Sequence, residues 1–301
     1  MQTPFEEVAG ESWTTWGQMV DFIHALADSS DRAEVVQLGR AVDGKPIYAV
    51  AVGSPTPRLR GGPVAFHVAA QHGNERTSYE AAIAQARDLT EATDPTIVDT
   101  LTRVTWLIVL SASPSTMGLR KYIWPDGTVG GPSVDMNRDH AARSLPETRA
   151  LATALRTYRP CLTLDHHSAI LPVQWMVASP NDELGNHPAV VAASKRVMDA
   201  MEDALTAGGK TFREFVGSSK NVREVLSNTA AYMHSPTLLL EGNRDDTPVE
   251  ALAVAKIALE AAHAHLGSHL DELVQAASAS RTGLASPTVA RSFGLASAAV
   301  P

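Results

Sequence analysis

Continuous apolar runs alternate along the chain with longer segments whose apolar positions recur at helical spacing. Most of the runs lack the polar-apolar alternation of a strand that has one solvent-exposed face, so they predict strands buried on both faces. The expected strands span residues 47–52, 64–70, 104–110, 162–167, 173–178 and 237–241, and the expected helices span residues 13–27, 78–89, 146–158, 188–207, 222–233 and 249–266. Strands that alternate with helices in this way predict an α/β sandwich with a largely parallel or mixed sheet.

A histidine and a glutamate follow the second expected strand. His72 and Glu75 stand three residues apart, where the strand gives way to a loop or to the start of a helix. Ligands of α/β proteins bind beyond the carboxyl ends of strands, and both side chains can turn towards one cation there. A catalytic zinc ion takes three protein ligands and keeps a fourth position open. The pair is therefore a candidate half-site for zinc, and a third ligand is expected elsewhere in the chain.

The fourth and the sixth of the expected strands end in residues that suit a zinc hydrolase. The fourth ends in His166 and His167, and successive residues of a strand face opposite sides of a sheet. Only one of the two histidines can therefore point into the site, and the pattern alone leaves open which one. The sixth strand ends in Glu241, whose charge is costly to bury without a purpose. A carboxylate there can act as general base towards a zinc-activated water.

A long loop between residues 113 and 134, rich in glycine and proline, separates the two parts of the candidate site. Loops of this length in compact domains are often functional. Arg120 on the loop, and Asn137 with Arg138 just after it, supply groups able to hold a carboxylate or to stabilise a developing oxyanion. Asp135 is placed to accept a hydrogen bond from the second ring nitrogen of a ligand histidine.

The composition is that of a globular protein and argues against several classes of partner. The chain has 301 residues, of which 44% are hydrophobic, enough to build one large domain. A net charge of −8 without a Lys/Arg run argues against nucleic acids and anionic membranes, and no apolar stretch has the length of a membrane span. The single cysteine, Cys161, excludes an intramolecular disulfide, and the start of the chain lacks a signal-peptide pattern. A cytoplasmic protein is expected.

The end of the chain differs in composition from the rest. We expect one catalytic domain over residues 1–276. Residues 277–301 are dominated by Ala, Ser, Gly and Pro, and a short Gly-Leu-Ala-Ser sequence occurs there twice, which predicts a weakly ordered tail.

The order of the candidate residues resembles that of the zinc metallocarboxypeptidases, the carboxypeptidase A-like and B-like enzymes. In both, a His-x-x-Glu motif is followed by an arginine, an Asn-Arg pair, a histidine and a glutamate. The resemblance covers about residues 13–266, and it implies one domain with a twisted mixed sheet of about eight strands between helices, and one zinc ion. The implied roles are zinc ligation by His72, Glu75 and His167, general base for Glu241, carbonyl polarisation by Arg120, and a grip on the substrate carboxylate by Asn137 with Arg138.

The resemblance also favours His167 over His166 as the third ligand. The third ligand of the family is commonly followed by Ser and preceded, two positions earlier, by Asp, which matches Ser168 and Asp165 around His167. The chain departs from the family in the residues before Arg120, where Ser113-Pro114-Ser115 stands instead of Asn-Pro-Asp.

Three functions are compatible with these residues. The first is a zinc carboxypeptidase that cleaves the C-terminal peptide or isopeptide bond of a substrate with a free carboxylate. The second is an amidohydrolase of N-acyl amino acids, as in the aspartoacylase and succinylglutamate desuccinylase group, which has similar ligands but an arginine much closer to its Asn-Arg pair. Arg120 and Asn137 are 17 residues apart, which favours the peptidase. The third, an inactive binding protein, is disfavoured because neither the base nor a ligand is missing.

Overall fold

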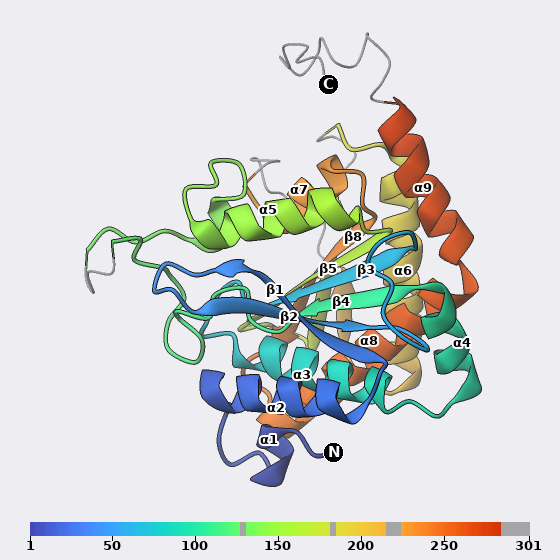
Figure 1. Ribbon diagram of the computed structural model, residues 1–301. Coiled ribbons are helices and arrows are strands. Elements are labelled where there is room, and N and C mark those ends of the chain that lie inside the picture. The colour runs from blue at the N-terminus through green and yellow to red at the C-terminus, as the bar shows by residue number, and fades with distance from the viewer. Residues whose placement is uncertain (127–130, 181–184, 215–223, 284–301) are drawn as a thin grey trace.

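The computed structural model describes residues 1–126, 131–180, 185–214 and 224–283. These residues form a sheet that lies between two layers of helices (Figure 1). The strands are β1 (Ala33–Arg40), β2 (Pro46–Val52), β3 (Val64–Ala69), β4 (Thr105–Val109), β5 (Leu162–Ala169), β6 (Trp175–Ala178), β7 (Phe212–Glu214) and β8 (Thr237–Asn243).

The sheet is mixed, and its parallel strands lie at the centre. The strand order is β1-β2-β4-β3-β5-β8-β6-β7. β4, β3, β5 and β8 run parallel to one another, whereas β2 pairs antiparallel with β1 and β4, and β6 pairs antiparallel with β8. The predicted class, α/β with a mixed sheet of about eight strands, is confirmed for the described residues. The carboxyl ends of β3, β5 and β8 meet at one edge of the sheet, where the candidate residues are expected.

The helices begin with recognisable start signals. They are α1 (Pro4–Glu7), α2 (Trp16–Ser29), α3 (Arg76–Thr90), α4 (Pro95–Arg103), α5 (Pro146–Tyr158), α6 (Pro188–Ala207), α7 (Leu226–Tyr232), α8 (Pro248–Ser268) and α9 (Leu270–Gly283), with one 3₁₀ turn, η1 (Met136–Arg138). Proline opens α5, α6 and α8, where its fixed φ suits the first turn and its missing N–H is not needed. None of the helices in the described part of the chain is both long and apolar enough to span a membrane.

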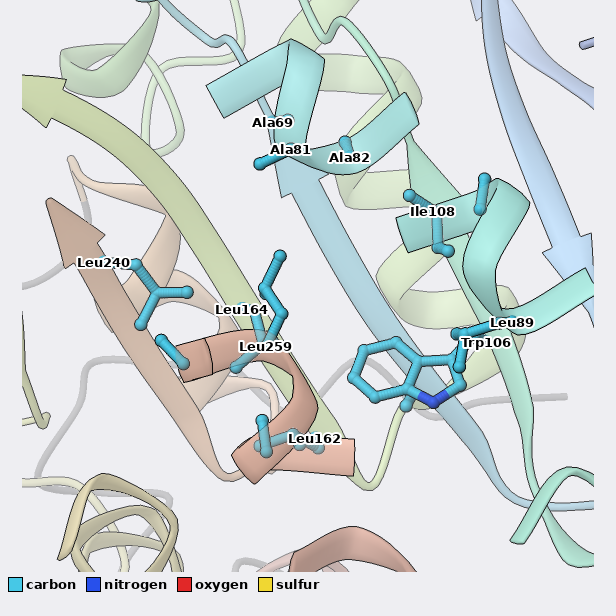
Figure 2. Packing of buried hydrophobic residues seen from close by; sticks show 14 of the residues in the cluster. Ala69, Ala81, Ala82, Leu89, Trp106, Ile108, Leu162, Leu164, Leu240 and Leu259 are labelled. Carbon is cyan, nitrogen blue, oxygen red and sulfur yellow. The ribbon is translucent and has the colours of Figure 1, made fainter. Parts of the chain in front are cut away.

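The sheet separates two hydrophobic cores. The larger core lies between the sheet and a layer that includes α2, α3, α6 and α8. Figure 2 shows part of it, in which Leu162 and Leu164 of β5 and Leu240 of β8 face Leu259 of α8. The smaller core fills the space between the opposite face and helices α5 and α7. Both faces of the central strands are therefore buried, as their continuous apolar sequences predict.

The alternation of side chains along β5 decides which of its residues can reach the site. Because Leu162 and Leu164 face the larger core, His166 faces it as well, whereas Asp165 and His167 face the α5/α7 layer. His166 is fully buried there, with its ring against those of His67 and Trp175.

Several elements of the structure were not predicted from the sequence, and each omission has a physical reason. β1 is an edge strand with many exposed residues and a register shift between Gln37 and Gly39, so it lacks a continuous apolar run. β7 and α1 are very short, and α4 is a short amphipathic helix. The expected tail also begins too early, because α9 passes through residue 276 and ends at Gly283, with Leu273 and Ala276 in the larger core. The rest of that tail lies outside the described residues.

Candidate metal centre

The loop after β3 brings His72 and Glu75 to the carboxyl edge of the sheet. Ala70 has a left-handed backbone (φ 52°), which turns the chain away from the strand direction. Glu75 then occupies the N-cap position of α3, but its side chain makes no capping hydrogen bond. Instead the hydroxyl of Ser78 donates to the carbonyl oxygen of Glu75 and accepts from the backbone N–H of Ala70, which fixes the loop. The Glu75 carboxylate is thus available to the site.

His72, Glu75 and His167 converge on one point. Each offers a ligand atom, and these atoms all lie within 4.8 Å of one another. The two carboxylate oxygens of Glu75 lie 2.7 Å from Nδ1 of His72 and 2.8 Å from Nδ1 of His167. All three side chains are buried. Two imidazole nitrogens and one carboxylate are a donor set that zinc hydrolases use, so these residues fit a zinc ion.

The Nε2 atom of each of the two imidazoles contacts a further carboxylate. Nε2 of His72 donates to Oδ1 of Asp135 (2.9 Å), and Nε2 of His167 donates to Oδ1 of Asp165 (2.9 Å). Such contacts fix the ring orientation and leave Nδ1 for a metal. The sequence pointed to Asp135, whereas the contact of Asp165 was not foreseen. The signal was present, because residues two apart on a strand share a face.

Gln71 is the other residue that sequence reasoning missed. Its side chain is fully buried, donates from Nε2 to Oδ1 of Asp165 (2.6 Å) and accepts at Oε1 from Nε2 of His140 (2.5 Å). Gln71 therefore links the carboxylate behind His167 to the 3₁₀ turn region. Gln71 directly precedes His72 in the chain, so a shift of Gln71 would also move a candidate metal ligand.

The electrostatic environment favours a cation. Burial alone would lower the pKa of His72, but hydrogen bonds with Asp135 and Glu75 raise it above its ordinary value. Burial also opposes the charge of His167, and the carboxylates of Asp165 and Glu75 raise its pKa well above the ordinary value. Burial alone would raise the pKa of Glu75, but the two histidines lower it. Three carboxylates thus face two imidazoles, a balance that draws positive charge into the site.

Glu241 lies beside the ligand cluster. It is the register partner of His167 on the neighbouring parallel strand, so the two side chains share a face of the sheet. Burial raises the pKa of Glu241 to about 7, against the lowering effect of His167. Its Oε2 atom is buried without a hydrogen-bond partner among the described residues. A carboxyl group that is left unpaired next to a metal-capable cluster is suited to proton transfer.

The segment that carries Arg120 packs directly against the ligand loop. The backbone N–H of Gly118 donates to the carbonyl oxygen of Gly73 (2.7 Å). A Cβ atom on Gly73 would lie 2.1 Å from the carbonyl oxygen of Thr116, so only glycine permits this approach. Arg120 follows two residues after Gly118, with its guanidinium over the ring of Trp124 at 3.9 Å.

The two residues expected to hold a substrate carboxylate have different surroundings. Asn137 is buried, with Nδ2 3.2 Å from Nε2 of His167 and Oδ1 accepting from the backbone N–H of Leu226. Arg138 is exposed and uses Nη1 to bind the carbonyl oxygen of Asn137 (2.8 Å). The Arg138 guanidinium can therefore reach solvent-borne ligands, whereas the Asn137 amide contacts the ligand cluster.

Comparisons with known proteins find similarity to carboxypeptidases. A family model described as zinc carboxypeptidase matches residues 19–114, which include His72 and Glu75. The chain is similar in structure to a metallo-carboxypeptidase from Burkholderia cenocepacia, with 20% identity, a TM-score of 0.68, and coverage of 86% of this chain and 70% of that one. The resemblance to the zinc carboxypeptidases is confirmed. A search of curated proteins finds no match.

Two further carboxypeptidase structures share the fold. A metallo-carboxypeptidase from Pseudomonas aeruginosa in complex with (2-guanidinoethylmercapto)succinic acid has 15% identity and a TM-score of 0.67, over 86% of this chain and 70% of that one. Carboxypeptidase A from Helicoverpa armigera has 15% identity and a TM-score of 0.66, over 90% and 75%. The chain is thus similar to zinc carboxypeptidases in part of its sequence and in its fold, and it contains a His-Glu-His group that could hold a metal ion.

The substitution Asp135→Asn tests the carboxylate behind His72. An asparagine keeps the oxygen that accepts from His72 and from the backbone N–H of Asn137, and it removes the negative charge. We expect the zinc affinity to fall about 10- to 100-fold, as for other groups that orient a metal ligand. Zinc competition against a chromogenic chelator measures the change. An unaltered affinity would show that the Asp135 charge does not support the site.

Proposed function

We propose that the protein is a zinc-dependent carboxypeptidase that hydrolyses the C-terminal peptide or isopeptide bond of a substrate with a free carboxylate. The observation that carries this proposal is the convergence of His72, Glu75 and His167 next to the unpaired carboxyl group of Glu241. The three converging residues would hold the zinc ion. When bound, zinc supplies a Lewis acid that activates water and polarises a carbonyl group.

Glu241 is assigned the proton transfers. Its unpaired Oε2 atom accepts a proton from the attacking water and later delivers it to the nitrogen of the departing amino acid. Its position on the strand next to His167 supports this role, because the strand backbone holds the carboxyl group beside the ligand cluster. A group on a strand is held more rigidly than a group on a loop, as proton transfer requires.

Arg120 and Arg138 are assigned to the substrate. The N–H groups of Arg120 donate to the scissile carbonyl oxygen as negative charge develops on it. Arg138 is the exposed guanidinium of the Asn-Arg pair, and a guanidinium can bind a terminal carboxylate through two parallel hydrogen bonds. Asn137 is expected to support that carboxylate once its amide turns from His167 towards the substrate.

The experiment that tests the proposal compares substrates with and without a C-terminal carboxylate. The zinc-loaded protein is expected to hydrolyse N-blocked dipeptides that have a free C-terminus and to leave their amides almost untouched. The variant Arg138→Ala is expected to raise KM for the free acids by about 10- to 100-fold, the loss expected when a charged hydrogen bond of 1.5–3 kcal/mol is removed. Equal hydrolysis of acids and amides would contradict a carboxypeptidase. Turnover of N-acyl amino acids in place of dipeptides would favour the amidohydrolase.

A further inference from the structure

The half-buried guanidinium of Arg120 has an aromatic partner and no acidic one among the described residues. Its Nε atom is buried without a hydrogen-bond partner, and no carboxylate in the described part of the chain lies within 4.0 Å of its guanidinium. Its central carbon lies 3.9 Å from the centre of the Trp124 ring, which is direct van der Waals contact between the two planar groups. The main contact of the cation is therefore the face of an indole, which attracts positive charge through the ring quadrupole.

Trp124 is itself fixed. Its Nε1–H donates to the carbonyl oxygen of Gly131 (3.1 Å). The preceding residue, Ile123, is fully buried and forms a two-residue antiparallel bridge with Val134, through backbone hydrogen bonds of 3.0 and 2.8 Å. Val134 directly precedes Asp135, whose carboxylate orients His72. The bridge between Ile123 and Val134 therefore lies next in sequence to both Trp124, whose ring contacts Arg120, and Asp135, whose carboxylate contacts a candidate metal ligand.

Contact with the face of an aromatic ring takes no hydrogen-bond acceptor, so it does not use up the N–H groups of the guanidinium. The N–H groups of a guanidinium point outward in its plane, whereas a stacked ring occupies only its face. A carboxylate partner would take the same N–H groups that a carbonyl oxygen needs, and it would cancel the charge. An aromatic partner restricts the position of Arg120 and preserves both its donors and its charge.

We propose that Trp124 is a positioning residue that holds the guanidinium of Arg120 ready for the scissile carbonyl oxygen, an inference that rests on the proposed function. Trp124 acts through Arg120 and makes no contact with the reacting atoms. Its removal lowers kcat more than it changes KM, because the arginine is needed most when charge develops on the oxygen.

The kinetic test is a double-mutant cycle. Trp124→Leu is expected to lower kcat about 2- to 30-fold, the rate equivalent of a cation–π contact, and Trp124→Phe to retain most of it. In an Arg120→Ala background Trp124→Leu is expected to have no further effect. Tyr122→Leu, an exposed aromatic residue of the same loop, serves as the matched control and leaves kcat unchanged. Zinc content and thermal unfolding of each variant check that the fold persists.

A spectroscopic test addresses the same contact without turnover. The Nε–H proton of Arg120 is expected to show an NMR shift from the ring current of Trp124 that is lost in Trp124→Leu and largely kept in Trp124→Phe. The positioning role would be overturned if Trp124→Leu lowered kcat by the same factor in the presence and in the absence of Arg120. It would also be overturned if the NMR shift of the Arg120 Nε–H proton were the same in Trp124→Leu as in the wild type. If the wild type hydrolyses no peptide and the ring-current shift is nevertheless present, the proposed function fails while the positioning of Arg120 stands.

Discussion

Replacement of Glu241 by Gln is expected to lower kcat about 10²- to 10⁴-fold while zinc remains bound, since general-base catalysis contributes a factor of that size. Gln has nearly the shape of Glu but cannot accept the proton that Oε2 takes up. Glu241 lies beside the ligand cluster and belongs to a strand of the sheet, so the substitution leaves the fold and His72, Glu75 and His167 in place. Steady-state kinetics on a blocked dipeptide, together with zinc content by mass spectrometry, measure both parts of the result.

The matched control is Glu202→Gln, the same chemical change at an exposed position of helix α6. It is expected to behave as wild type. Retention of full activity by Glu241→Gln would remove Glu241 from proton transfer. Loss of zinc together with activity would instead indicate that Glu241 belongs to the ligand set.

The second large effect is expected for the adjacent histidines of β5. His167→Ala removes one of three converging donors, so zinc affinity is expected to fall by more than the roughly 10- to 100-fold that loss of an orienting group causes. Activity is expected to disappear with the metal. His166→Ala removes an equally buried side chain that faces the larger core, so it is expected to lower thermal stability and to keep the zinc.

The pair of variants is informative because the two residues are neighbours on one strand and are equally buried, but face opposite sides of the sheet. Zinc titration and thermal unfolding on both proteins separate loss of a ligand from loss of packing. The opposite pattern, with zinc lost from His166→Ala and kept in His167→Ala, would reverse the ligand assignment.

Much of the fold follows from the sequence because the central strands are long apolar runs and several helices begin at prolines. Helices α5 and α6 have the predicted bounds, 146–158 and 188–207. The edge strand β1 does not follow, because its exposed side chains carry no apolar run. Helix α9 does not follow either, because its C-terminal half is rich in Ala and Ser and resembles a tail, although Ala276 and Ala277 are buried.

The location of the site could also be anticipated, since His72, His167 and Glu241 each follow or end an apolar run. The choice between His166 and His167 could not be made from alternation alone, because the face that meets the metal is decided by the packing of β5 against helices. The contact between Arg120 and Trp124 could not be predicted from the sequence either. It depends on the path of a loop that has no periodic pattern, and only the structure brings the two side chains together.

Anomalous scattering at the zinc absorption edge, from crystals of the purified, zinc-loaded protein, locates the zinc ion and so tests the ligand assignment. We expect one strong peak within bonding distance of Nδ1 of His72, the carboxylate of Glu75 and Nδ1 of His167, with Glu241 adjacent. A protein that binds no zinc, or a peak at another group such as the stacked rings of His265 and His269, would contradict this assignment.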